Sequence, residues 1–223
     1  MELEKVYTGN KVDVYQTLKN AIQYLALMPG STINEQELAS ELGVSRTPIR
    51  EALIRLSSET LIDIYPQKGT YVSRIDFEFA NEVAYMRHIL DTEICLTLCR
   101  ERVDLHDAVD EILYFMRAAV KKKNVIEYLK KDQEFHKALF AYGKHELIWD
   151  IISTSRAHYN RFVILDLQLD GKLENSYQQH CDILDSIASG DEKKLLEILD
   201  VHHDHTGVDY EMIQKNFPEY FEA

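Results

Sequence analysis

The feature that most constrains this chain is a pair of short helix signals separated by one glycine, within residues 34–55. Asn34 suits an N-cap, because its side chain can accept a hydrogen bond from the amide of Glu37 while Glu37 reaches back. Gly43 should end this first helix, since the residue after a helix commonly needs a positive φ. The positions expected to be buried are Leu38, Ala39 and Leu42.

A second helix is expected to begin almost at once. Thr47 suits an N-cap, and Pro48 follows where a missing N–H does no harm. Two short helices joined by a tight glycine turn form a helix-turn-helix, which offers the start of its second helix to the major groove of DNA. The residues offered there are Ser45, Arg46, Thr47 and Arg50, and the expected buried positions are Ile49, Ala52, Leu53 and Leu56.

Positive charge is concentrated on the second helix. Arg46 and Arg50 are four residues apart and share one side, and a guanidinium can pair with guanine in bidentate fashion or hold a phosphate. For an isolated pair, a solvated helix face would be the simpler interpretation. Over residues 42–58, however, the basic residues are Arg46, Arg50 and Arg55 and the only acid is Glu51, in a chain with a net charge of −13. This local excess favours DNA binding.

Short strand signals follow the second helix. Residues 61–65 have the alternating pattern of a strand and are rich in β-branched side chains. Residues 66–69 are typical of a turn, and the strand pattern resumes over residues 70–73. A two-stranded wing is therefore predicted. Lys68 at its tip could contact a phosphate, with a merely solvated lysine as the alternative. Before this unit, apolar residues at helical spacing over residues 11–27 predict a further helix that packs on the helix-turn-helix.

These motifs resemble the winged-helix domain of the GntR family of bacterial transcription regulators. The resemblance rests on Pro-Gly at 29–30, Glu-Leu-Ala at 37–39, the run over 42–56 and Gln-Lys-Gly-Thr-Tyr-Val at 67–72. It implies that Arg46, Thr47 and Arg50 touch operator DNA and that Gly69 lets the wing tip approach the minor groove or the backbone. One departure is Gln36, which stands where many members carry an arginine that contacts DNA.

Composition excludes several other classes of protein. A chain of 223 residues with 45% hydrophobic and 28% charged residues can bury a sizeable core. No apolar run approaches the roughly 20 residues of a membrane span, and the N-terminus lacks signal-peptide character, so a cytoplasmic location and no membrane partner are expected. Cys95, Cys99 and Cys181 are an odd number without a Cys-x-x-Cys spacing, so a disulfide framework is not expected.

The acidic charge lies in the second part of the chain. Residues 1–75 carry 8 basic and 9 acidic side chains, whereas residues 76–223 carry 17 and 29. A field of that sign repels DNA, but salt screens it beyond about 8–10 Å, so binding must rely on the local basic helix and on doubling in a dimer. The net charge therefore does not exclude a DNA partner.

From residue 77 onward the pattern is helical throughout. Helices are predicted over 77–101, 105–121, 124–142, 146–169, 173–189 and 191–215. The expected fold class is thus mostly α, with a winged helix-turn-helix at 1–75 and an antiparallel all-α bundle of about six helices at 76–223. Such a bundle resembles the effector-binding FCD domain of the FadR-type subgroup, and it would also carry dimerisation.

Candidate metal ligands lie on three of the predicted bundle helices. Asp132 and His136 are at i, i+4 on one helix, while His180 and His202 lie on the last two. One carboxylate and three neutral imidazoles suit a divalent transition metal, with zinc or nickel as the first candidates. Spacing alone would favour hydrogen-bonded or solvated histidines. The FCD resemblance implies metal ligands, because many such domains carry Asp-x-x-x-His followed by one histidine in each of the last two helices.

A metal there would form the floor of a pocket for a small organic acid. Arg87 and Arg161 are candidates for clamping the carboxylate of that effector, and solvated arginines are the alternative. We therefore expect a homodimeric repressor or activator that binds the half-sites of a pseudo-palindromic operator, and we do not expect an enzyme. A metal-sensing regulator and a metal-dependent enzyme with a DNA-targeting domain remain open, although Glu134, the nearest carboxylate on the ligand helix, should face away.

Overall fold

The computed structural model describes residues 3–203 and 208–221, which form two compact units. The first unit comprises residues 1–80, 157–162 and 211–223, and the second comprises residues 81–156 and 163–210. The predicted domain boundary near residue 75 stays a prediction. Over the described ranges, no helix combines the length and apolar character that crossing a membrane requires.

The first unit begins with a hairpin that sequence patterns did not predict. Strands β1 (Tyr7–Thr8) and β2 (Lys11–Val12) pair antiparallel, and α1 (Val14–Gln23) follows. Asp13 caps α1 by accepting a hydrogen bond from the amide of Gln16 at 2.9 Å. The helix predicted over 11–27 is therefore shorter at both ends, because the hairpin occupies its start and Leu25 adopts a positive φ of 60° just after it.

The helix-turn-helix consists of α2 (Glu35–Leu42) and α3 (Arg46–Ser58). Asn34 caps α2 by accepting from the amides of Gln36 and Glu37, and Gly43 ends it with a φ of 71°. The N-cap predicted at Thr47 is wrong, because Ser45 holds that position in an extended conformation and Thr47 lies in the first turn of α3. The second helix therefore begins two residues earlier than predicted.

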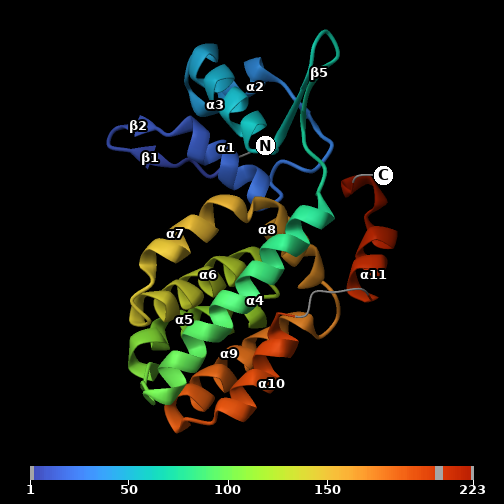
Figure 1. Cartoon of the computed structure of the whole chain (residues 1–223). Helices are drawn as coiled ribbons and strands as arrows, with labels where there is room; N and C mark the ends of the chain where they lie inside the picture. The colour runs from blue at the N-terminus through green and yellow to red at the C-terminus, as the bar shows by residue number, and fades with distance from the viewer. Residues whose placement is uncertain (1–2, 204–207, 222–223) are drawn as a thin grey trace. The chain divides into compact units, whose positions relative to one another are not determined.

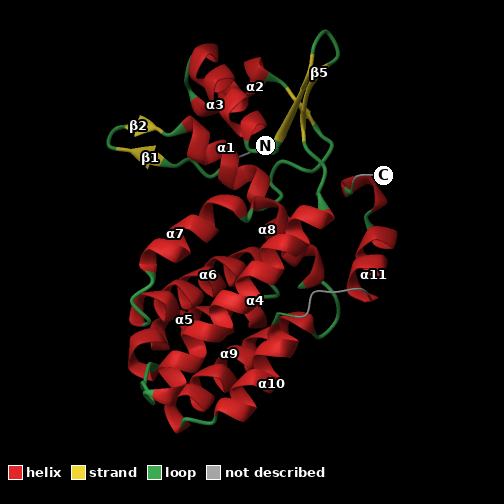
Figure 2. Ribbon diagram, viewed as in Figure 1, coloured by secondary structure: helices red, strands yellow, loops and turns green. Residues whose placement is uncertain are grey.

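The wing is the hairpin of β4 (Ile62–Tyr65) and β5 (Gly69–Val72), as predicted. A short strand before α2, β3 (Thr32–Ile33), pairs antiparallel with the other edge of β5 and gives the sheet order β3-β5-β4. Over the described residues, the named strands all lie before α4 (Figure 2). The core beneath the sheet contains every apolar position predicted for α2 and α3, namely Leu38, Ala39, Leu42, Ile49, Ala52, Leu53 and Leu56.

The rest of the described chain is helical (Figure 1). The helices are α4 (Phe77–Arg100), α5 (His106–Lys121), α6 (Val125–Tyr142), α7 (Glu146–Ser155), α8 (Ala157–Asp166), α9 (Lys172–Ser189), α10 (Glu192–His202) and α11 (Val208–Asn216), followed by the 3₁₀ turn η1 (Pro218–Tyr220). In the second unit, α5 packs on α6 and α9, α6 packs on α7, and α9 packs on α10. Cys95 and Cys99 are buried on α4.

Two of the predicted bundle helices are each divided. The helix predicted over 146–169 breaks at Arg156, whose ψ is 14°. Just before it, the hydroxyls of Ser153, Thr154 and Ser155 donate to carbonyls three residues back, which competes with the helical hydrogen bonds. The helix predicted over 191–215 is present as α10 and α11, and residues 204–207 between them lie outside the described residues.

Candidate metal centre and DNA-binding face

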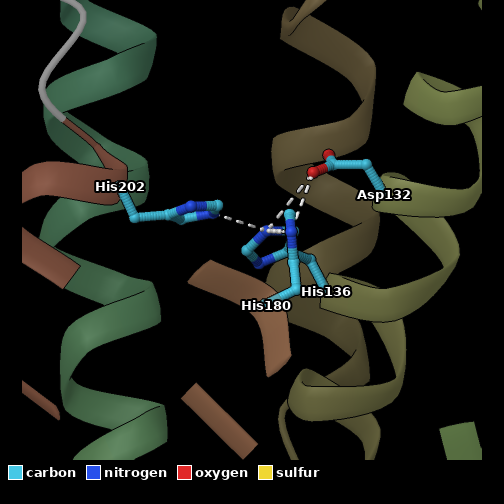
Figure 3. Close-up of side chains that lie close together, drawn as sticks. All are labelled: Asp132, His136, His180 and His202. Carbon is cyan, nitrogen blue, oxygen red and sulfur yellow. Dashed lines mark hydrogen bonds and ion pairs between the residues drawn. The ribbon is translucent and has the colours of Figure 1, made fainter. Parts of the chain in front are cut away.

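Four predicted ligands come together in the second unit. Asp132 and His136 project from α6, His180 from α9 and His202 from α10 (Figure 3). One ligand atom from each lies within 4.8 Å of the others. In the part of the chain that the structure describes, this is the one group of three or more such side chains with that convergence.

The distances between the ligand atoms suit a small cation. Nε2 of His136 lies 3.4 Å from Nε2 of His180 and 3.3 Å from Nε2 of His202. Oδ1 of Asp132 lies 3.0 Å from Nε2 of His180 and 3.8 Å from Nε2 of His136. The nitrogen ligands of a tetrahedral zinc ion, each about 2.0–2.1 Å from the metal, are separated by roughly 3.3 Å. The donor set therefore fits such an ion in both chemistry and spacing.

Each imidazole is oriented through its other nitrogen. Nδ1 of His180 lies 2.7 Å from the carbonyl oxygen of Ser176, and Nδ1 of His202 lies 3.0 Å from Oε1 of Gln179. Nδ1 of His136 lies 3.1 Å from Oδ2 of Asp91. Protons on Nδ1 of His180 and His202, donated to those two oxygens, would leave the Nε2 lone pairs of both rings free to bind a cation. Oxygen acceptors behind ligand histidines are a general feature of metal sites.

Burial and neighbouring charges set the ionisation of this cluster. Burial opposes ionisation of Asp132, but the bond to His180 and the charges of His136, His180 and Arg87 outweigh it and hold the carboxyl pKa well below its usual range. Burial lowers the pKa of His136, and it lowers that of His202 further together with the neighbouring histidines. A metal ion binds an ionised carboxylate and neutral imidazoles, and the directions of the pKa shifts of Asp132, His136 and His202 favour those forms.

A buried ion pair supports the cluster from α4. Nη2 of Arg87 donates to Oδ2 of Asp91 at 3.0 Å, and both side chains are almost fully enclosed. The same oxygen lies 3.3 Å from Nε2 of His203. Burial opposes ionisation of Asp91, yet Arg87, His136 and His203 hold its pKa well below the usual range. Sequence reasoning missed Asp91, although an acid four residues after Arg87 on an apolar helix was a signal for an ion pair.

Arg161, the other predicted effector contact, belongs to the first unit, whereas Asp132, His136, His180 and His202 belong to the second. It is fully buried on the part of α8 that belongs to the first unit, where it donates to the carbonyl oxygen of Ser73 at 2.7 Å. It also lies 2.9 Å from Nδ1 of His158, and burial lowers its pKa to about 9. The effector roles of Arg87 and Arg161 stay predictions, and their surroundings differ sharply.

The predicted DNA-binding arginines lie on an exposed face at the start of α3. The side chains of Arg46 and Arg50 are 56% and 62% exposed, and both donate to the carboxylate of Glu35 on α2. Ser45 is the N-cap, and Thr47 in the first turn is exposed. Sequence reasoning missed Glu35, because its contact with α3 depends on the angle between the two helices.

The remaining predicted DNA contacts lie elsewhere on the first unit. The guanidinium carbon of Arg55 lies 3.6 Å from the ring centroid of Tyr15. Lys68 is exposed in the turn between β4 and β5. Gly69 has a φ of 131°, and a Cβ there would lie 3.2 Å from the Tyr71 ring, so the turn requires glycine. The DNA roles of all these residues stay predictions.

Known proteins match both parts of the chain. The family model described as bacterial regulatory proteins, gntR family, matches residues 10–72, and the FCD domain model matches residues 82–205. An uncharacterised helix-turn-helix transcriptional regulator in an unstable DNA locus of Streptomyces ambofaciens is 30% identical over 214 residues, covering 95% of this chain and 89% of the relative. A gluconate operon transcriptional repressor of Bacillus licheniformis is 30% identical over 158 residues, covering 70% of this chain and 64% of the relative.

Solved structures share the fold. McbR/YncC of E. coli has a TM-score of 0.71 at 20% sequence identity, covering 92% of this chain and 96% of that protein. At this identity the similarity shows the fold alone. It confirms the prediction of a winged helix-turn-helix followed by a helical bundle.

Proposed function

Because the chain belongs to the gntR family of bacterial regulatory proteins and carries an FCD domain, we propose that it is a homodimeric repressor that responds to a small organic acid. The chain is a transcriptional regulator, and regulators of this family bind operator DNA. Repression is supported by the gluconate operon repressor among its relatives. The families and relatives that it matches are regulators rather than enzymes.

DNA binding would use the exposed start of α3 and the wing. Ser45, Arg46, Thr47 and Arg50 would enter the major groove, while Lys68 and Gly69 would bring the wing tip to the backbone or minor groove. Arg55 is better placed for a phosphate at the edge, since its guanidinium is stacked on Tyr15. Two copies on the half-sites of a pseudo-palindrome would double these contacts, which compensates for the acidic charge of residues 76–223.

The bundle would hold a divalent transition metal, zinc or nickel, through Asp132, His136, His180 and His202. The single observation that carries this proposal is the convergence of three Nε2 atoms whose Nδ1 partners already face oxygen acceptors. A metal held there could take a carboxylate or hydroxyl oxygen as a further ligand if its coordination number exceeded four. The effector class would then be a small, metal-chelating organic acid.

This chain's own residues would prepare the cluster for such an acid. Asp91 and the Ser176 carbonyl hold two rings in the ligating orientation, and Arg87 supplies a positive charge beside them. An effector alters DNA binding only if it binds one arrangement of the two DNA-binding units of a dimer more tightly than another. The proposed mechanism is therefore a shift between two dimer arrangements.

Metal content tests the site directly. Untagged protein purified without a metal column should contain close to one zinc or nickel ion per chain. His136→Ala and His180→Ala should each lose it, whereas His145→Ala, which changes a histidine outside the cluster, should retain it. If wild-type protein stays metal-free after incubation with zinc and with nickel, the histidines are structural and the metal proposal is wrong.

The effector is tested with the metal-loaded protein. Cobalt- or nickel-substituted protein should change its visible spectrum when hydroxy acids, sugar acids or dicarboxylates are titrated in, and the same acids should change DNA binding. Gluconate is the first acid to test, because one relative represses a gluconate operon. An unchanged spectrum with every acid in this panel would contradict the organic-acid effector while leaving the metal site intact.

A metal-sensing regulator is the second candidate. It is favoured by one observation, namely that four protein ligand atoms lie within 4.8 Å of one another, which is the number of ligands that a closed zinc site would need. In that case removing the metal would by itself change DNA binding, with no organic acid present. Metal-free protein that still binds operator DNA and releases it with an acid would exclude this candidate.

A further inference from the structure

Glu35, a residue without a predicted role, joins the two arginines at the start of α3. Its Oε2 accepts from Nη2 of Arg46 at 2.9 Å and from Nη2 of Arg50 at 3.0 Å, and its Oε1 accepts from Nε of Arg50 at 3.3 Å. The Arg50 pairing is bidentate, which fixes the plane of that guanidinium as well as its position. One carboxylate therefore holds two cationic side chains side by side.

The carboxylate lies behind the arginines. Its side chain is 22% exposed, whereas those of Arg46 and Arg50 are 56% and 62% exposed. Arg46 keeps Nε and Nη1, and Arg50 keeps Nη1, outside these pairings, so each guanidinium retains donors for another partner. Bonds from Arg50 and then Arg46 lower the pKa of Glu35, so it stays ionised at neutral pH.

Fixing the two arginines has an entropic consequence. A free arginine has many rotamers, and ordering it in a complex costs free energy that a preorganised side chain has already lost. This gain applies to base contacts, because bidentate pairing with guanine depends on the position and plane of the guanidinium. A phosphate contact depends mainly on charge and tolerates many geometries.

The charge of Glu35 acts in the opposite direction on binding without sequence preference. The three side chains together carry one positive charge instead of two, which weakens attraction to any DNA backbone. The same residue therefore favours contacts that depend on geometry and disfavours those that depend on charge alone.

We propose that Glu35 is a specificity-determining residue that positions Arg46 and Arg50 for base contacts while reducing their attraction to non-operator DNA. This inference rests on the proposed DNA-binding role of the two arginines. It assigns Glu35 no contact with DNA, so Glu35 would act through its neighbours.

Three substitutions separate position from charge. Glu35→Asp keeps the charge but shortens the side chain, and Glu35→Gln removes the charge. Glu37→Gln is the matched control, because it removes a charge from the same helical turn, where Glu37 bonds the side chain of Asn34 and no arginine. Thermal denaturation establishes that each variant is folded.

Binding is measured by fluorescence anisotropy at several salt concentrations on two DNA probes. One is a duplex selected by the wild-type protein from a random-sequence pool, and the other is a scrambled duplex of equal length and composition. Glu35→Gln should bind the scrambled duplex several-fold more tightly, with a salt slope steeper by about one. The ratio of its affinity for the selected duplex to its affinity for the scrambled duplex should fall about tenfold. Glu35→Asp should weaken binding to the selected duplex with little change in slope.

The outcomes distinguish this inference from the function on which it rests. Arg46→Ala should weaken binding to the selected duplex, and if it does not, the proposed arginine contacts are wrong. If Arg46→Ala weakens binding but both Glu35 variants keep the wild-type ratio, only the role of Glu35 is overturned. The same conclusion follows if Glu35→Gln shifts both affinities by the same factor as Glu37→Gln.

Discussion

His158 makes the stability of the first unit sensitive to acid. Its ring is 3% exposed, with Nε2 lying 3.2 Å from the carbonyl oxygen of Thr60 and Nδ1 accepting from the amide of Asp76 at 3.0 Å. Arg161 donates to the same Nδ1 at 2.9 Å. A proton on Nδ1 would remove both of these bonds and place two cations together. Burial, and then the charge of Arg161, lower the pKa of His158 from 6.5 to about 4.

The sign and size of the effect follow from this shift. Below pH 6.5 the unfolded chain takes up a proton at His158, whereas the folded protein does so only near pH 4. The stabilisation is therefore complete above pH 6.5 and is lost as the pH falls toward 4, by about 3 kcal/mol in total because each unit of pKa corresponds to roughly 1.4 kcal/mol.

The perturbation is His158→Gln, measured by urea unfolding from pH 7.5 to 4.5. At pH 7.5 the variant should be less stable by about 1–3 kcal/mol, because glutamine can replace the donor to Thr60 but not the Nδ1 acceptor. This deficit should shrink by about 2–3 kcal/mol at pH 4.5, since the variant has no proton to take up at this position. Other histidines titrate in both proteins and cancel in the difference.

His106 supplies a control of opposite sign. Its bond with Asp104 and a second contact with Asp185 raise its pKa, so its stabilisation is present at low pH and is lost as the pH rises through its folded pKa. His106→Gln should therefore still lose stability as the pH falls from 6.5 toward 4, as the wild-type protein does. A deficit of His158→Gln that is equal at pH 7.5 and 4.5 would refute the argument that a neutral His158 stabilises the unit.

Three further predictions concern the DNA-binding face and the metal cluster. Arg46→Ala should weaken binding to a selected duplex by about 1–3 kcal/mol at fixed salt, and an unchanged anisotropy titration would remove Arg46 from the contacts. Gly69→Ala should destabilise the protein by about 1–3 kcal/mol in urea, because of its φ of 131° and the Tyr71 ring at 3.2 Å, and should cost more than Gly9→Ala, where no atom lies within 4 Å of the added Cβ. Removing the metal with a chelator should lower the melting temperature of wild-type protein. If free metal stood at 100 times its Kd, the loss of stability should be about 2.7 kcal/mol. The melting temperature of His180→Ala should not change.

The winged helix was predictable because its signals are local. Asn34 and Gly43 have the chemistry that starts and ends a helix, and the apolar positions of α2 and α3 follow helical spacing. Strand β3 was missed because two residues carry no periodicity, and it exists only because β5 offers it an edge. The N-cap of α3 was misplaced because Ser45 and Thr47 both carry hydroxyl side chains that suit an N-cap, so local chemistry did not distinguish them.

The sequence predicted the four residues of the cluster in the bundle, but it did not predict the residues that orient their side chains. Asp132 and His136 share a helix face by spacing, and the family resemblance indicated His180 and His202. Asp91 reaches the cluster from α4, which approaches His136 only through tertiary packing. No periodicity within one helix reports that approach, so the residues that orient the rings required the structure.

Because of the break at Arg156, residues 157–162 belong to the first unit, which contains the winged helix, and not to the bundle. On one side of the break, Arg156 donates to Oε1 of Gln133 within the bundle unit, and on the other, His158 and Arg161 bond residues of the winged unit. An unbroken helix over 146–169 would have assigned all three side chains to the bundle. Because buried polar groups are costly when left without partners, a fragment ending near residue 75 would lose the guanidinium that satisfies the Ser73 carbonyl. The compact unit that contains the winged helix is thus discontinuous in sequence.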